Sequence, residues 1–121
     1  MADKVFTTDR GNIDSPEVGA DYESAGAFDR LRVGSLGVFF RDGFRTRFIP
    51  YDRIDRVFIR IQQAHPTKSV GVAVYDYFRL VFVHNGTEFA EYLSEDEKAL
   101  DEALAEIGKH GVATGFVGTA E

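Results

Sequence analysis

Residues 36–61 read LGVFFRDGFRTRFIPYDRIDRVFIRI, and they contain a hairpin signal, a proline break and a second apolar alternation in succession. Two apolar runs, Leu36–Phe40 and Phe44–Ile49, are separated by the three residues 41–43. Gly43 closes this three-residue connection, and a glycine there supplies the positive φ that such hairpin loops need. The stretch therefore predicts two antiparallel strands joined by a tight turn.

The second strand of this hairpin is expected to have one buried face and one wet face, because side chains alternate with a period of two. The buried face is expected to carry Phe44, Thr46 and Phe48. The wet face is expected to carry Arg45, Arg47 and Ile49. Pro50 then removes a ladder donor and favours an extended residue before it, so the chain should turn over residues 50–53.

The next strand repeats the alternation. Its inward residues are expected to be Val57, Ile59 and Ile61. Its outward residues are expected to be Arg56, Phe58 and Arg60. Beyond a loop at 64–68, residues 69–78 and 79–84 form two more runs rich in β-branched and aromatic residues, with a break expected at Asp76. Asn85-Gly86, before residues 87–92, is a strong signal for a second hairpin.

A single amphipathic helix is predicted after these strands. Ser94 and Glu97 have the spacing of a capping box, in which each side chain bonds the other residue's backbone amide. The apolar residues that follow at helical spacing are Leu100, Ala103, Leu104 and Ile107. Gly108 or Gly111 is expected to end the helix. The short alternation at 28–33 predicts a first strand, so the whole pattern indicates a mostly β, α+β chain of about six or seven strands.

Composition narrows the function classes. The chain has 121 residues, 44% of them hydrophobic, with eleven Phe, five Tyr and no Cys. That length suits one domain, the aromatic content favours strands, and the lack of Cys excludes thiolate chemistry and Cys-ligated metals. We expect a cytoplasmic protein, because no run is long enough to span a membrane and residues 1–11 lack a signal-peptide core. The net charge of −6 makes nucleic acid a poor partner.

Positive charge is concentrated in the middle of the chain. Residues 30–60 hold eight arginines against three acids, whereas the segments before and after them are both acidic. Arg45, Arg47, Arg56 and Arg60 are the candidate anion-binding residues, because their strands are expected to be neighbours that present them on one face. The favoured alternative is that these arginines pair across strands with the chain's own acids, such as Glu88, Glu91 and Asp55.

The phrase FIPYDRIDRVFIRI resembles the strand, turn and strand of bacterial pleckstrin-homology-like (PH-like) and GRAM-like domains, where an IPY-x-x-I element follows a hairpin. The matching residues are Ile49, Pro50, Tyr51, Ile54 and Val57. The resemblance covers residues 31–109 and implies a bent antiparallel sheet or seven-stranded, two-sheet barrel capped by one C-terminal helix. It also implies a role in binding, scaffolding or self-assembly and not in catalysis.

The expected organisation is an irregular N-terminal arm at 1–27, a PH-like domain at 28–110 and a Gly-rich C-terminal tail at 111–121. The arm is rich in Gly, Asp, Ser and Thr and poor in large apolar residues. In the tail, the glycines do not follow a strand-to-helix phosphate loop, so a nucleotide site is not predicted. Phe116 and Val117 in the tail, together with Phe58, are the candidate interface residues.

No catalytic residue, metal site or cofactor is predicted. The histidines 65, 84 and 110 share no ligand spacing with one another or with a pair of acids. The favoured function is a noncatalytic PH-like module that acts through protein contacts, including homo-oligomer formation. The alternative is a domain that binds an anion, a phosphorylated small ligand or a lipid headgroup through the arginine face, with a membrane surface the less favoured partner. An enzyme whose pocket forms at an oligomer interface is a third reading.

Overall fold

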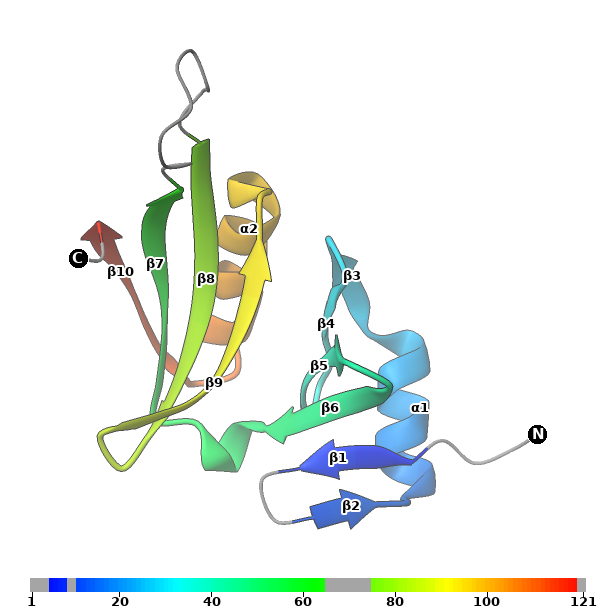
Figure 1. The fold of residues 1–121 in the computed structure, drawn as a ribbon. Helices are drawn as coiled ribbons and strands as arrows, with labels where there is room; N and C mark the ends of the chain where they lie inside the picture. Colours follow the sequence, from blue (N-terminus) through cyan, green and yellow to red (C-terminus); the bar gives the residue numbers. More distant parts are fainter. Residues whose placement is uncertain (1–4, 9–10, 65–74, 120–121) are drawn as a thin grey trace.

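The computed structural model describes residues 5–8, 11–64 and 75–119, which form two sheets and two helices (Figure 1). The first sheet has six strands in the order β2-β1-β6-β5-β4-β3. Their bounds are β1 Phe6–Thr8, β2 Gly11–Ile13, β3 Gly26–Phe28, β4 Leu31–Val33, β5 Gly37–Asp42 and β6 Arg45–Pro50. The second sheet has four strands in the order β10-β7-β8-β9. Their bounds are β7 Arg56–Ala64, β8 Tyr75–His84, β9 Thr87–Ser94 and β10 Ala113–Thr119. The expectation of a mostly β chain is confirmed, but the two sheets do not close into a barrel over the described residues.

The hairpin of β5 and β6 forms with a tighter turn than predicted. Asp42 pairs with Arg45, so only Gly43 and Phe44 lie in the turn, and Gly43 adopts a φ of +67°. Phe44 is therefore fully exposed at the hairpin tip, and the expectation that it shares a buried face with Thr46 and Phe48 is wrong. The latter two are buried as expected. Phe44 lies in the turn because a two-residue connection matches the twist of the two strands.

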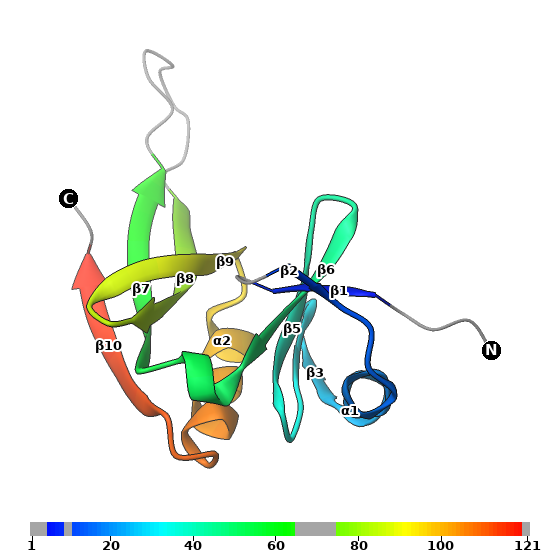
Figure 2. The same ribbon diagram turned by 90° about the horizontal axis from the view of Figure 1, so that it is seen from below.

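Strands β5 and β6 are buried on both faces in the middle of the six-stranded sheet, so the expected wet face is buried at Ile49 although it is exposed at Arg45. Phe39 and Phe48 stack at 4.8 Å between ring centroids on the side of α1 (Pro16–Ser24). On the opposite face, Val38, Phe40 and Ile49 pack into the main core between the sheets. Ile49 is thus only 2% exposed, and the expectation that it faces solvent is wrong. Figure 2 shows why: α1 lies on the outer side of the sheet, and α2 lies between the two sheets.

The chain changes sheets at the predicted proline turn. Pro50 ends β6, residues Tyr51–Arg53 form a 3-10 turn labelled η1, and β7 begins in the other sheet. Tyr51 Oη donates to Gly34 O at 2.6 Å, and its ring stacks on His110 at 4.5 Å between centroids. Strands β6 and β7 are therefore not hydrogen-bonded neighbours, and the expectation that they adjoin is wrong. The turn reorients the chain instead of reversing it within one sheet.

The second hairpin is confirmed. His84 pairs with Thr87, and Asn85 and Gly86 form the turn with φ values of +52° and +76°. Positive φ at both positions is the reason that Asn-Gly is favoured there. The loop expected at 64–68 and the run expected at 69–78 fall largely on residues 65–74, which lie outside the described residues. From Tyr75 onward β8 is continuous, so the break expected at Asp76 does not occur.

The C-terminal helix α2 (Glu97–Gly108) is present, and its apolar stripe is buried as predicted. Leu100, Ala103 and Ile107 are fully buried, and Leu104 packs against the same core. The predicted capping box is wrong in detail. Asp96 is the N-cap, and its carboxylate accepts from Ala99 N at 3.1 Å. A carboxylate one residue before the helix is an equally good cap and also suits the positive end of the helix dipole.

The N-terminal segment is ordered where it is described, which corrects the expectation of an irregular arm. It contributes β1, β2, α1 and β3 to the fold. The carboxylate of Asp21 on α1 is buried and accepts the backbone N–H groups of Ser35 at 2.6 Å and Leu36 at 2.9 Å. A buried carboxylate satisfied in this way is strongly anchored. The expected single strand at 28–33 is instead the hairpin of β3 and β4, with Asp29 in its turn at a φ of +58°.

The Gly-rich tail also differs from expectation, because most of it forms a strand. Strand β10 pairs in parallel with β7, with Ala113 opposite Arg56 and Phe116 opposite Ile59. A parallel strand needs a crossover connection, and α2 provides it. No helix among the described residues is long and apolar enough to cross a membrane.

Candidate functional site

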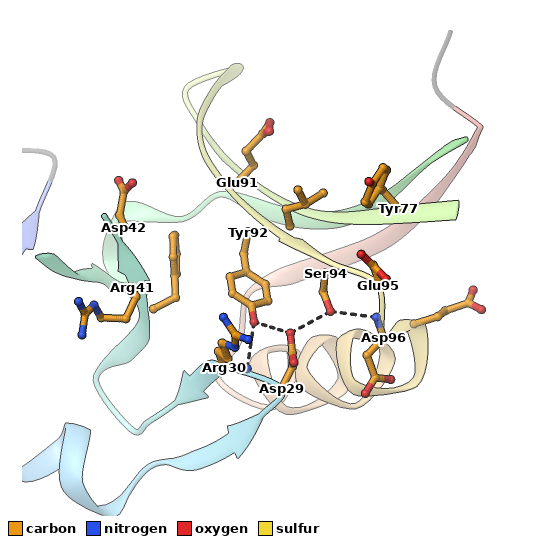
Figure 3. Close-up of a pocket in the computed structure, with 13 residues that line it drawn as sticks. Asp29, Arg30, Arg41, Asp42, Tyr77, Glu91, Tyr92, Ser94, Glu95 and Asp96 are labelled. Atoms are coloured by element: carbon orange, nitrogen blue, oxygen red, sulfur yellow. Dashed lines mark hydrogen bonds between the residues drawn. The ribbon is translucent and has the colours of Figure 1, made fainter. Parts of the chain in front are cut away.

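An open groove of about 750 Å³ lies where the two sheets diverge. One wall is formed by residues 91–97, which are the end of β9 and the start of α2. The other wall is formed by the β3–β4 turn at Asp29 and Arg30 and by residues 40–42 at the end of β5. Figure 3 shows Arg41 and Asp42 on one side, Glu95 and Asp96 on the other, and Tyr92 and Asp29 between them. The groove therefore joins segments that are about fifty or more residues apart in the sequence.

A hydrogen-bond network forms the floor of this groove (Figure 3). Tyr92 Oη donates to Asp29 Oδ2 at 2.6 Å and accepts from Arg30 N at 2.9 Å. Ser94 Oγ donates to the same carboxylate oxygen at 2.9 Å and accepts from Asp96 N at 3.0 Å. The network ties the β3–β4 turn to β9 and to the first turn of α2. It depends on Asp29 adopting a positive φ, which Asp tolerates better than most residues.

The pKa values of the two titrating groups of this network, Asp29 and Tyr92, are both shifted away from 7. The hydrogen bond from Tyr92, followed by that from Ser94, lowers the pKa of Asp29 below its usual value. Burial, followed by the carboxylate of Asp29, raises the pKa of Tyr92 to about 12. A general acid or base at neutral pH needs a pKa shifted towards 7. At neutral pH Asp29 is therefore an anion that accepts hydrogen bonds, and Tyr92 is a neutral phenol that donates one.

Replacing Tyr92 by phenylalanine should destabilise the protein. The substitution keeps the buried ring but removes the donor to Asp29 and leaves Arg30 N without its acceptor. A hydrogen bond to a charged group contributes roughly 1.5–3 kcal/mol, so we expect the free energy of unfolding to fall by about 2 kcal/mol in urea titrations. Ser35→Ala, which removes an exposed hydroxyl group, is the control and should change it by less than about 0.5 kcal/mol. A fall below this same limit for Tyr92→Phe would show that the network is not formed in solution.

The stability contributed by Asp29 should be lost in acid. A carboxyl group whose pKa is lower in the folded than in the unfolded protein stabilises the fold above the unfolded value, near 3.9. That contribution disappears as the pH falls through the lower, folded pKa. Because Asp29 is exposed, we expect Asp29→Asn to cost only about 0.5–1 kcal/mol at pH 7. Melting temperatures of the two proteins should converge below pH 4, and a constant difference from pH 7 to pH 3 would exclude this linkage.

The candidate arginines are divided between the two sheets and do not form one face. Arg45 and Arg47 lie on β6, whereas Arg56 and Arg60 lie on β7. Arg60 donates to both oxygens of Glu88, at 3.1 and 2.6 Å, which is the cross-strand pairing that the alternative interpretation predicted. Arg47 contacts Asp42 at 3.8 Å and Phe89 O at 3.4 Å. Arg45 is exposed and has no carboxylate partner among the described residues.

The candidate interface residues Phe58, Phe116 and Val117 also lie in surroundings that differ from the expectation. Phe58 is only 3% exposed, because the guanidinium groups of Arg56 and Arg60 cover its ring at 4.7 and 5.2 Å from the centroid. The expectation that Phe58 is exposed is therefore wrong, and alternation alone could not reveal the two covering arginines. The backbones of Phe116 and Val117 pair with β7. Their expected interface role concerns side chains that lie outside the described part of the structure.

One histidine has a carboxylate neighbour but not a catalytic arrangement. His84 Nδ1 lies 3.4 Å from Asp55 Oδ1, which resembles the orienting pair of a general base. However, His84 Nε2 faces Arg53 Nη1 at 3.2 Å. A guanidinium is always a donor, so it occupies the nitrogen lone pair that a general base would use. Asp55 also accepts from Asn85 N at 2.5 Å, which fixes the β8–β9 turn.

Three acids from one wall of the groove, Glu95, Asp96 and Glu97, follow one another in the sequence. Local sequence patterns predicted that a helix starts there, but they did not predict the groove. Asp29 and Tyr92 were missed, because they meet across 63 residues and no periodicity signals such a contact. No group of three or more potential ligands with metal-binding geometry occurs among the described residues. No family model, curated protein or solved structure matches the chain.

Proposed function

We propose that this chain is a noncatalytic, PH-like module that acts through protein contacts, including contacts between its own copies. Its strand order supports the fold assignment. Strands β3 to β9 are seven strands in two sheets and are followed by α2, which is the arrangement that the resemblance implies. The motif residues Ile49, Pro50 and Tyr51 lie at the corner where the chain passes from one sheet to the other.

The observation that carries this function is an open groove bordered by an unpaired strand edge and an exposed apolar side chain, both of which a macromolecular partner can contact. Strand β9 has a neighbour on one side only, because it is the last strand of its sheet. An edge strand is a natural place for a second chain to bind. Leu93 on this strand is 52% exposed, although it lines the groove. The pKa values of Asp29 and Tyr92 on the floor of the groove are shifted away from 7, which favours binding over catalysis.

Sedimentation velocity tests self-association. We expect the weight-average sedimentation coefficient to rise with protein concentration between about 5 and 100 µM, the range of modest protein–protein affinities. A coefficient that stays at the monomer value over this range would overturn self-association.

Anion binding is the second candidate function, and one observation favours it. Arg45 is exposed without a carboxylate partner, so it is available to a phosphate group. Against it, Arg60 is already bound bidentately to Glu88, and β6 and β7 lie in different sheets. Isothermal titration with inositol phosphates at low and moderate salt tests this function. The absence of heat at both salt concentrations would remove it.

A further inference from the structure

Among the described residues, the hairpin at one wall of the groove carries arginines without a carboxylate partner, and the opposite wall carries acids without a cationic partner. The cationic tip, defined as Arg41, Phe44 and Arg45, ends the β5–β6 hairpin, and its Arg41 lines one wall of the groove. The acid at this hairpin end, Asp42, lies 3.8 Å from Arg47. The acidic wall, defined as Glu95, Asp96 and Glu97, begins α2 at the other. Among the residues that the structure describes, no ion pair joins the two sets across the groove. Figure 3 shows Arg41 facing away from the acidic wall.

The charges of the tip and the wall also lack partners elsewhere in the described residues. Arg41 donates only to the carbonyl of Gly43, at 3.3 Å, and Arg45 has no partner. Glu95 and Glu97 have no cationic partner either. The other described acidic residues of β9 differ, because Glu88 and Glu91 are bound to Arg60 and Arg79. Among the acids from Glu88 to Glu97, those without a cationic partner therefore lie between the end of β9 and the start of α2.

Phe44 gives the cationic tip an apolar element. It is fully exposed, at 102% of the reference area, whereas the other aromatic rings whose burial is described are buried or partly covered. An exposed Phe between two arginines is an effective interface anchor, because aromatic residues and Arg dominate binding hot spots. The groove offers apolar surface to receive it, from Leu93, Phe40 and Tyr77.

We infer that two copies of the chain associate about a two-fold axis at this groove, with the cationic tip of each copy placed against the acidic wall of the other. This inference rests on the proposed function and specifies its surface. A two-fold interface must be self-complementary, so one patch must contain both halves of each contact. This surface meets that requirement, because the cationic tip beside one wall and the acidic wall opposite are the two complementary sets. A single rotation then pairs both tips with both walls, and each charge contact occurs twice.

The affinity is expected to be modest and dependent on salt. Exposed charge pairs contribute little individually, and they weaken as the Debye length falls. The interface should therefore have a dissociation constant in the range of about 10–100 µM at low salt and weaken several-fold between about 50 and 300 mM salt. This behaviour would distinguish it from the largely apolar interface of an obligate dimer.

Complementary charge reversals test the inference in sedimentation velocity. Arg45→Glu places acids opposite acids in both contacts, and Glu95→Lys places cations opposite cations. Each variant alone should associate at least about tenfold more weakly than the unmodified chain. An equimolar mixture of the two should recover association to within about threefold, because every contact is again between opposite charges. Lys109→Glu, at the C-terminal end of α2, changes the net charge by the same amount as Arg45→Glu and is its control.

Phe44→Ser tests the apolar anchor independently of charge, with Leu36→Ser as the control, because Leu36 is also exposed but lies at the other end of β5. We expect the first to weaken association about tenfold and the second to leave it unchanged. Association of the unmodified chain that is insensitive to Phe44→Ser and to both reversals would overturn this surface and leave self-association standing. A strictly monomeric unmodified chain would overturn both. Circular dichroism melts confirm that each exposed variant is folded.

Discussion

Phe6→Ala should lower the free energy of unfolding by about 4 kcal/mol, although it changes a residue next to the chain start. Phe6 is fully buried, and its ring contacts Tyr22, Phe39 and Phe48 at 5.5, 5.3 and 6.4 Å between centroids. Its strand β1 adds to the sheet in parallel with β6. Truncating a buried Phe removes its transfer free energy and leaves a cavity, at a cost of roughly 3–5 kcal/mol.

Val5→Ala is the matched control for this substitution. Val5 is the preceding residue and is 51% exposed, so its truncation should cost less than about 0.5 kcal/mol. Urea titrations of both variants give the comparison, because equal slopes show that the same surface unfolds. If Phe6→Ala were as mild as Val5→Ala, the N-terminal segment would not be packed on the sheet in solution.

Gly37→Ala should be the second severe substitution, at roughly 3 kcal/mol or more. A Cβ at Gly37 would collide with the carbonyl oxygen of Ile49 and would lie 2.8 Å from Pro50 Cα and 2.6 Å from the Phe48 ring. Two of these obstacles are backbone atoms, so β5 and β6 must separate locally to admit the methyl group. Forcing an extra methyl group into such packing costs about 1–3 kcal/mol, and more where the backbone must move.

Gly19→Ala provides a control of opposite sign. Gly19 lies inside α1, and a Cβ there would meet no atom within 4 Å. Alanine in a helix interior is favoured over glycine by about 0.5–1 kcal/mol, so this variant should melt at a higher temperature than the unmodified chain. If Gly37→Ala also raised the melting temperature, β5 and β6 would not approach as closely as described.

The elements that could be predicted are those specified by neighbouring residues. The Asn85-Gly86 turn follows from the positive φ that both residues tolerate, and α2 follows from the 3.6-residue spacing of Leu100, Ala103 and Ile107. The N-terminal elements β1, β2, α1 and β3 were not predicted, because this segment is polar in composition and each of its strands has only three residues. One usable signal was present, since Ser15-Pro16 is an N-cap followed by proline, and Ser15 Oγ does accept from Val18 N.

The candidate site was beyond local patterns for a different reason. Its floor joins a turn at Asp29 to a strand at Tyr92, and its charge contrast arises only where β5 ends opposite the start of α2. The predicted arginine face does not form for a related reason. The sequence does not show that the chain passes from one sheet to the other at Pro50, so β6 and β7 were expected to be neighbours. The alternation of Arg56, Phe58 and Arg60 was correct, yet it could not show that two guanidinium groups would cover the ring between them.

Because β5 is buried on both faces, hydrophobicity does not specify how it aligns with β6. Val38, Phe39 and Phe40 are all apolar, and all are buried on one face or the other. A one-residue slip of the strand would therefore replace one apolar side chain by another on each face, with little of the usual loss of apolar burial. The alignment must instead come from shape: a residue without a side chain, Gly37, fits only against Pro50, and the Gly43 turn sets the other end.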